Sequence, residues 1–143
     1  MRWDRGENTT GHMLDGMHMK IRTEADIYMA LSTVRRLMKE LGFSELHQQK
    51  VLVTVSELTR NVLDHAGANG VFGCEVLDGR GIRVRVTDRG PGIENVTRAL
   101  EGKKSPHSHG LGLGLAGVKR LMDECTIETS TGGTSVVATK WNS

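Results

Sequence analysis

Three glycines at alternate positions stand in the stretch GLGLGL, residues 110–115, and they constrain this chain more than any other feature. Without Cβ atoms, Gly110, Gly112 and Gly114 accept backbone angles closed to other residues and let main-chain N–H groups approach an anion closely. The residues that follow, 116–124, have the apolar spacing of a helix. Free N–H groups and the helix dipole at such a junction both favour negative charge. The segment therefore predicts a cradle for the phosphates of a nucleotide.

The same segment also matches the dinucleotide fingerprint G-x-G-x-x-G through Gly112, Gly114 and Gly117. That fingerprint needs a strand directly before it and an acidic residue about twenty positions later. Here residues 105–109 read SPHSH, which indicates a loop, and the later position falls in the turn at residues 132–133. We therefore do not expect a Rossmann fold. A hinge loop without a ligand is the alternative for this motif taken alone.

Composition indicates a single globular domain. A chain of 143 residues suffices for one domain with its own core. The net charge is only +2, with both signs interspersed, and aromatic residues make up 3% of the chain. This composition does not indicate binding to nucleic acid or to a membrane. Cys74 and Cys125 lack metal-ligand spacing, so free thiols are expected. With no apolar run of membrane-spanning length and no signal core, we predict a cytoplasmic protein.

Apolar periodicity predicts the order of the elements. Residues 1–19 have no sustained period and are predicted to be a flexible tail, followed by one domain over residues 20–143. Thr23 and Ser44 are expected to cap two successive helices. The predicted fold is an α+β two-layer sandwich, with helices on one face of a mixed, mostly antiparallel sheet. The other predicted elements are strands near 20–22 and at 71–77, 82–88, 125–131 and 134–141, helices at 94–100 and 116–124, and a lid-like region over 90–109.

The strand predicted at 82–88 ends in a carboxylate on its apolar face. Alternate residues within 82–86 are apolar, and Asp88 has the same parity. Because burying a carboxylate without a partner is costly, Asp88 needs a donor such as the exocyclic amine of a ligand. The alternative is a structural Asp that caps the following turn. Beyond it, Gly90 and Gly92 flank a rigid turn where the backbone can close on a flat ring, and Ile93 can supply an apolar wall.

A second group of polar residues lies on the second predicted helix. Glu57 and Asn61 are four residues apart, so their side chains share nearly the same face, and Asp64 follows one turn on. A carboxylate and an amide oxygen at this spacing suit base catalysis and a magnesium ion. A solvated helix face is the alternative for this pattern alone.

Taken together, these motifs resemble a known superfamily. ELTRN on a helix, DRGPG after a strand, GLGLGL before a helix and GT near the last strand are similar to the N, G1, G2 and terminal boxes of the GHKL superfamily. Its members include gyrase, heat-shock chaperone, histidine kinase and mismatch-repair ATPases. The likeness runs from about Ile21 to Trp141. Through KELGF, SELTRNVLDHAG and GLGLAGVKRLMDE, the chain most resembles anti-sigma-factor-type serine/threonine kinases, in particular the RsbT-type switch kinases of the stressosome.

The resemblance implies a Bergerat ATP-binding fold with defined roles. Asp88 would accept a hydrogen bond from the adenine amine, and Thr134 would join that network. Glu57 would be the general base, acting on a protein hydroxyl, and Asn61 would be a ligand of Mg²⁺. The residues before the glycines, 106–109, depart from relatives, which tend to have Ser, Thr and Gly there. The complete set implied for ATP binding is Asn61, Asp88, Gly90, Gly92, Ile93, Gly110, Leu111, Gly112, Leu113, Gly114 and Thr134.

The resemblance also implies a function. We expect an ATP-dependent protein serine/threonine kinase that acts as a partner-switching regulator of a bacterial stress pathway. Its partners would be STAS-domain antagonist and scaffold proteins, and a PP2C-type phosphatase or another output protein, with a homodimer as one expected assembly. The alternatives are an anti-sigma factor kinase that binds a sigma factor directly, and a nucleotide-gated binding module without catalysis.

Overall fold

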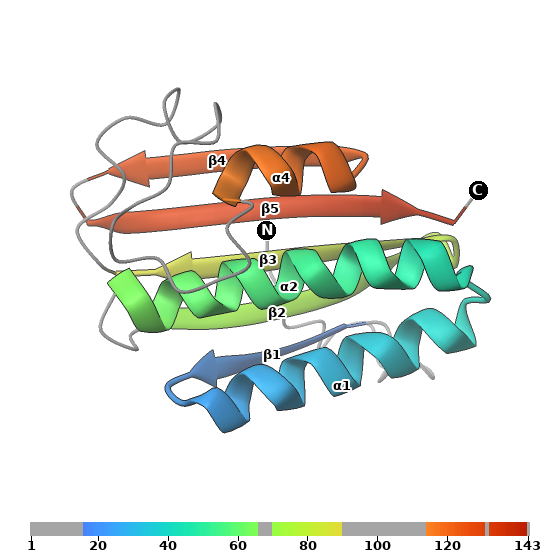
Figure 1. Cartoon of the computed structure of the whole chain (residues 1–143), viewed down its shortest axis with the longest axis horizontal. Helices are drawn as coiled ribbons and strands as arrows, with labels where there is room; N and C mark the ends of the chain where they lie inside the picture. Colours follow the sequence, from blue (N-terminus) through green and yellow to red (C-terminus); the bar gives the residue numbers. More distant parts are fainter. Residues whose placement is uncertain (1–15, 66–69, 90–113, 131, 143) are drawn as a thin grey trace.

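The computed structural model describes residues 16–65, 70–89, 114–130 and 132–142. The described strands form one sheet in the order β1-β2-β3-β5-β4, and every neighbouring pair is antiparallel. The helices lie on one face of this sheet (Figure 1), which confirms the predicted two-layer sandwich. The elements are β1 (Gly16–Ile21), α1 (Glu24–Glu40), α2 (Glu45–His65), β2 (Gly70–Leu77), β3 (Gly81–Asp88), α4 (Gly114–Leu121), β4 (Glu124–Ser130) and β5 (Gly133–Trp141).

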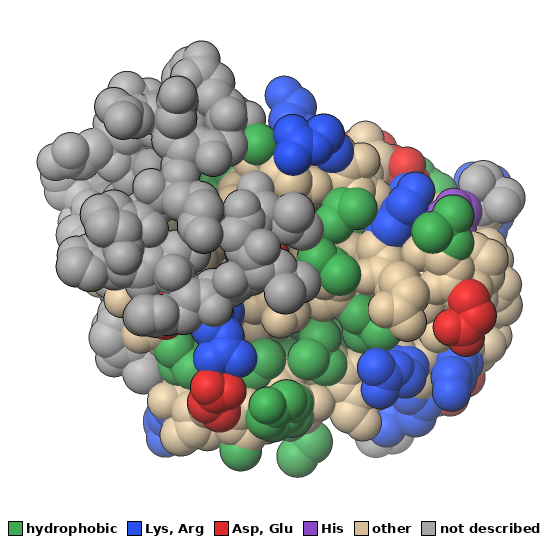
Figure 2. Space-filling model, viewed as in Figure 1, with side chains coloured by type: hydrophobic (Ala, Val, Ile, Leu, Met, Phe, Trp, Pro, Cys, Tyr) green, Lys and Arg blue, Asp and Glu red, His purple; other side chains and the backbone are tan. Residues whose placement is uncertain are grey.

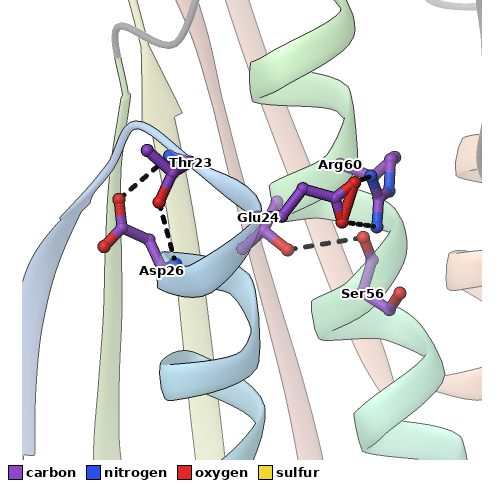
Figure 3. A network of polar contacts seen from close by, with 6 residues as sticks. Thr23, Glu24, Asp26, Ser56 and Arg60 are labelled. Carbon is purple, nitrogen blue, oxygen red and sulfur yellow. Dashed lines mark hydrogen bonds and ion pairs between the residues drawn. The ribbon is translucent and has the colours of Figure 1, made fainter.

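Side-chain caps fix the starts of α1 and α2. Thr23 Oγ1 accepts a hydrogen bond from the Asp26 N–H at 3.3 Å, and Asp26 Oδ2 accepts one from the Thr23 N–H at 3.0 Å, which completes a capping box (Figure 3). Gly42 follows α1 with φ +78°, a left-handed conformation that ends helices readily. Ser44 Oγ then accepts from the His47 N–H at 3.1 Å. Both predicted caps are confirmed.

The first strand begins earlier than predicted. β1 starts at Gly16 rather than near Lys20, so residues 16–19 belong to the sheet and not to the predicted tail. Met17, Met19 and Ile21 alternate along β1 and pack against the core, while β1 pairs with β2. This alternation of residues is typical of a strand. The many polar residues around it made the pattern hard to recognise in the sequence.

The chain after α4 also departs from the prediction. The helix ends at Leu121, and β4 begins at Glu124, where we expected the helix to continue. Asp123 explains the early end, because its Oδ2 accepts from the Trp141 N–H at 2.7 Å and its Oδ1 from Lys140 Nζ at 3.3 Å. These bonds hold Asp123 beside the end of β5, so the chain leaves the helix before this residue.

The core lies between α2 and the sheet. Val51, Val55, Leu58 and Val62 form the buried stripe of α2 that faces the strands. A Cβ at Gly70 would come within 2.7 Å of the Val62 side chain, so glycine is what lets the end of α2 lie close to β2. None of the helices in the described ranges is long and apolar enough to cross a membrane.

Candidate nucleotide site

Glu57 and Asn61 lie on the side of α2 opposite Gln48. α2 runs between α1 and α4 across the sheet (Figure 1). Gln48 Nε2 donates to the Phe43 carbonyl at 2.9 Å, so the Gln48 flank faces the end of α1. Successive helical residues are about 100° apart, which places Glu57 and Asn61 on the opposite flank.

Glu57 differs from the other buried polar side chains of α2. Thr59 Oγ1 donates to the Val55 carbonyl at 2.7 Å and Thr54 Oγ1 to the Lys50 carbonyl at 3.1 Å, so these hydroxyls are satisfied by their own helix. A carboxylate cannot use a helix carbonyl in this way, because when ionised it only accepts hydrogen bonds. Glu57 is nevertheless 2% exposed. A buried carboxylate beside a half-buried Asn61 is the kind of polar group that functional sites contain.

Asp88 and Thr134 are brought opposite each other by the sheet. They are direct partners in the antiparallel pairing of β3 with β5. The apolar and polar faces of β3 alternate as predicted, with Ile82, Val84 and Val86 buried. Thr134 is also mostly buried, and its Oγ1 lies 3.0 Å from Thr129 Oγ1.

Glycine is required where β5 begins. Gly133 has φ +144°, and a Cβ there would overlap the carbonyl oxygen of Asp88. The main chain of β5 therefore lies in direct contact with the end of β3. Only glycine permits such a close approach. This contact fixes the position of Asp88 relative to Thr134.

The candidate groups gather at one end of the molecule. α4 begins at Gly114, whose φ of +61° is a left-handed conformation, one of the unusual backbone angles that glycine was predicted to allow in this segment. In Figure 1 this end of α4 lies toward the same side as the C-terminal half of α2, the end of β3 and the start of β5. The structure thus pairs Asp88 with Thr134 directly, and the elements that carry Glu57, Asn61 and Gly114 lie toward the same end of the molecule. Their individual roles stay predictions.

The remaining predicted site residues lie outside the described part of the chain, as does the helix expected at 94–100. They are Gly90, Gly92, Ile93, Gly110, Leu111, Gly112 and Leu113.

The structure adds an ion pair that sequence reasoning missed. Arg60, next to Asn61, donates from both terminal nitrogens to the Glu24 carboxylate, at 2.7 and 3.1 Å (Figure 3). The hydrogen bond from Arg60 holds the pKa of Glu24 below its usual value. The pair joins the first turn of α1 to the helix that carries Glu57. Because 36 residues separate its members, no local spacing rule could find it.

Comparison with known proteins identifies the class. Residues 22–140 match the family model of the histidine kinase-like ATPase domain, so the chain belongs to this family. Within it, the chain is a homologue of the serine/threonine-protein kinase RsbT of Bacillus subtilis (strain 168). The two are 41% identical over 133 residues, which cover 90% of this chain and 98% of RsbT. The anti-sigma F factor of Clostridium acetobutylicum is 31% identical over 114 residues, 76% of this chain and 80% of that protein.

Solved structures support the fold. The RsbU and RsbW domains of a Mycobacterium tuberculosis protein superpose with a TM-score of 0.64 at 19% identity, over 88% of this chain and 31% of that one. The SiaB–SiaC complex of Pseudomonas aeruginosa gives a TM-score of 0.59 at 12% identity, over 87% and 88%. The predicted GHKL fold and RsbT-like kinase homology are therefore confirmed.

Proposed function

We propose that this protein is an ATP-dependent serine/threonine kinase that acts in the cytoplasm as a partner-switching regulator of a bacterial stress pathway. It phosphorylates STAS-domain antagonist and scaffold proteins and then activates a PP2C-type phosphatase or another output protein. The observation that carries the proposal is the likeness to RsbT over 98% of that kinase's length.

The adenine end of the site is assigned to β3 and β5. Asp88 accepts a hydrogen bond from the exocyclic amine of adenine, and Thr134 stands directly opposite on β5. A carboxylate at the end of an apolar row gives directional recognition of an amine, because an acceptor-only group cannot pair with a carbonyl of another base. The Gly133 contact supports this assignment, since it holds the two strand ends at a fixed separation.

The phosphate end is assigned to the start of α4. The first N–H groups of a helix have no partner within the helix, and the dipole adds partial positive charge there. Gly114, with its positive φ, lets the chain enter the helix while its amides face an anion. In this assignment, main-chain N–H groups stabilise the negative charge of the phosphates. Phosphoryl transfer depends on such stabilisation.

The donor set at α2 fits a magnesium ion. No cluster of three His, Cys, Asp or Glu side chains suited to a metal occurs in the described ranges, so a cage built from side chains is not available there. Mg²⁺ characteristically uses one or two protein oxygens together with phosphates and waters, and the half-buried Asn61 can supply such an oxygen. When bound, the ion neutralises the negative charge of the phosphates.

Glu57 is assigned as the general base. The Ser or Thr hydroxyl oxygen of the partner forms a bond to the γ-phosphorus, the bond from that phosphorus to the bridging β–γ oxygen breaks, and ADP leaves. Glu57 takes the hydroxyl proton. Its position one turn before Asn61 supports this role, because base and phosphate-bound cation then lie on the same flank of α2.

The test is incubation with labelled ATP, Mg²⁺ and the STAS-domain proteins encoded nearby, followed by phosphoamino-acid analysis. Phosphoserine or phosphothreonine on such a protein is the expected product. Phosphohistidine would instead identify a sensor-kinase fragment, and no transfer to any of them would refute the proposal.

The likeness to the anti-sigma F factor favours a second candidate, a kinase that also binds a sigma factor directly. Stable binding to a purified sigma factor, competed by the unphosphorylated STAS-domain protein, would distinguish it. A nucleotide-gated module without catalysis is the third, and it predicts that partner switching survives Glu57→Gln.

A further inference from the structure

The outward face of α1 combines basic and apolar side chains. The residues recur at intervals of three, four and seven, which places them on one side of the helix. We call this face the α1 surface. Its six residues, all exposed, are Tyr28, Met29, Ser32, Arg35, Arg36 and Lys39.

The C-terminal half of the α1 surface is positively charged. Arg35, Arg36 and Lys39 contribute three positive charges and the neighbouring Glu40 one negative charge, a net of +2. Among the described residues, no ion pair engages these three cations, whereas Glu24 at the other end of α1 is paired with Arg60. These three cations can therefore form ion pairs with carboxylates of another molecule.

A shallow groove lies among the same side chains. It is largely open to solvent, has a volume of about 420 Å³, and is lined by Ser32, Arg35, Arg36, Lys39 and Glu40. A hollow bordered by guanidinium groups accepts carboxylates well, because each guanidinium presents a planar fork of donors.

The N-terminal half of the α1 surface is apolar. Tyr28 is 64% exposed and Met29 60% exposed, on adjacent positions. In Figure 2, hydrophobic side chains lie over the first half of α1 and Lys or Arg side chains over the second. Tyr, Met and Arg are enriched where proteins bind proteins. Nucleic acid or a membrane would require a broader basic surface than three cations beside a Glu.

The α1 surface adjoins the catalytic helix without covering its reactive flank. Tyr28 lies one turn after Glu24, whose carboxylate bonds to Arg60 of α2. Helix geometry places Glu57 and Asn61 on the side of α2 opposite Gln48. A protein seated on α1 can thus reach past the edge of α2 while the nucleotide is bound.

We propose that the α1 surface docks the protein substrate through an acidic helix of that substrate. Carboxylates of this helix lie over the groove, and an apolar side chain packs on Tyr28 and Met29. The surface extends about 16 Å, the length of three helical turns. This inference rests on the proposed function, since the partner is the STAS-domain protein that the kinase phosphorylates.

Steady-state phosphorylation of that STAS-domain protein by the full chain tests the proposal. The variant Arg35→Glu/Arg36→Glu is compared with Lys119→Glu/Arg120→Glu, a matched pair of adjacent, exposed cations in the last turn of α4. We expect the first variant to raise the KM for the protein substrate about tenfold, with kcat and the KM for ATP within about twofold of the parent. The α4 control should leave all three within about twofold.

A second variant addresses the apolar half. Tyr28→Ser/Met29→Ser should also raise the KM for the protein substrate, and circular dichroism checks that each variant is folded. An unchanged KM in the α1 variants, or an equal rise in the α4 control, would overturn the docking surface. So would loss of binding to phosphatidylglycerol vesicles with KM unchanged, which would assign the face to a membrane.

Failure of the proposed function gives a different result. If the parent chain phosphorylates none of the STAS-domain proteins, the kinase assignment is wrong. Titration of the same proteins against the parent and the Arg35→Glu/Arg36→Glu variant then still decides the docking surface, because weaker binding by the variant alone supports it and equal binding refutes it.

Discussion

The two ends of the sheet differ in their side-chain bonds, although glycines with positive φ occur at both, Gly42 and Gly79 at one end and Gly114 and Gly133 at the other. At the end near the C-terminus, side chains bond to the chain itself: Asp123 accepts from the Trp141 N–H and from Lys140, and Asn142 Nδ2 donates to the Leu41 carbonyl at 3.0 Å. At the nucleotide end, the close contact is made by the main chain itself. Gly114 and Gly133 have positive φ, and the main chain of Gly133 lies against Asp88.

The difference indicates how stability and function are divided. The C-terminal end closes the fold with a polar network and with Arg80, whose guanidinium carbon lies 5.5 Å from the centre of the Trp141 ring. At the nucleotide end, α4 begins with N–H groups that have no partner within the helix, which suits the proposed anion site. We therefore expect substitutions at the nucleotide end to change activity more than stability, and those at the other end to do the reverse.

The largest expected effect is that of Glu57→Gln. The amide keeps the size of the side chain but cannot take a proton, so phosphate transfer should fall by about 10²–10⁴-fold. ATP affinity, measured by calorimetric titration, should change by less than about twofold, because Gln makes no new contact with nucleotide. Glu45→Gln, exposed in the first turn of the same helix, is the control and should keep full transfer. Undiminished transfer by Glu57→Gln would remove this residue from the chemistry.

Asp88→Ala should have the next largest effect, on binding. Losing a charged acceptor for the adenine amine costs about 1.5–3 kcal/mol, or about tenfold to a hundredfold in ATP affinity. Selectivity for ATP over GTP should fall as well, because the carboxylate discriminates amine from carbonyl. ATP and GTP titrations measure both quantities. Equal affinities for parent and variant would place adenine elsewhere.

Asp123→Asn probes the opposite end and should act on stability alone. Burial disfavours the charged form of Asp123, but hydrogen bonds from the Trp141 N–H and from Lys140 outweigh this and hold its pKa below the usual 3.8. The charge therefore stabilises the fold above the unfolded pKa, and that stabilisation is lost as the pH falls through the folded one. Because the Asp123 side chain is 40% exposed, solvent screens part of this effect, and urea unfolding at pH 7 should show a loss of no more than about 1 kcal/mol.

The same variant separates the two ends. Since Asp123 is protonated in strong acid, the difference between parent and Asp123→Asn should shrink as the pH drops below 3.8. ATP affinity at pH 7 should be unchanged. A weakened ATP affinity with unchanged stability would mean that the two ends are not divided as described.

Local chemistry allowed much of the fold to be predicted from sequence. The capping residues Thr23 and Ser44 act within three residues of themselves, and the turn at Asp78 and Gly79 adopts the positive φ values, +52° and +65°, that its sequence favours. The parity of β3 placed Asp88 correctly because side-chain alternation is a property of the strand alone.

Contacts between distant segments explain what sequence reasoning missed. The early end of α4 depends on bonds from Asp123 to β5 residues 17 and 18 positions later in the chain, which no helix rule includes. The pairing of Asp88 with Thr134 likewise needed the sheet order, which the family resemblance implied and local spacing could not. The motif residues were recognised from their sequence patterns, and their roles in the site stay predictions.

The Glu24–Arg60 pair should give the smallest effect and tests whether α1 merely supports the catalytic helix. Glu24 is exposed, so solvent screens the pair, and Glu24→Gln should lower phosphate transfer by no more than about threefold. The change should disappear in 1 M salt, where exposed ion pairs are screened within about 3 Å. The swap Glu24→Arg/Arg60→Glu should restore transfer if the pair only positions α2. A swap that stays as slow as Arg60→Glu alone would instead show that Arg60 itself contacts a substrate, and would extend the nucleotide site onto the outer side of α2.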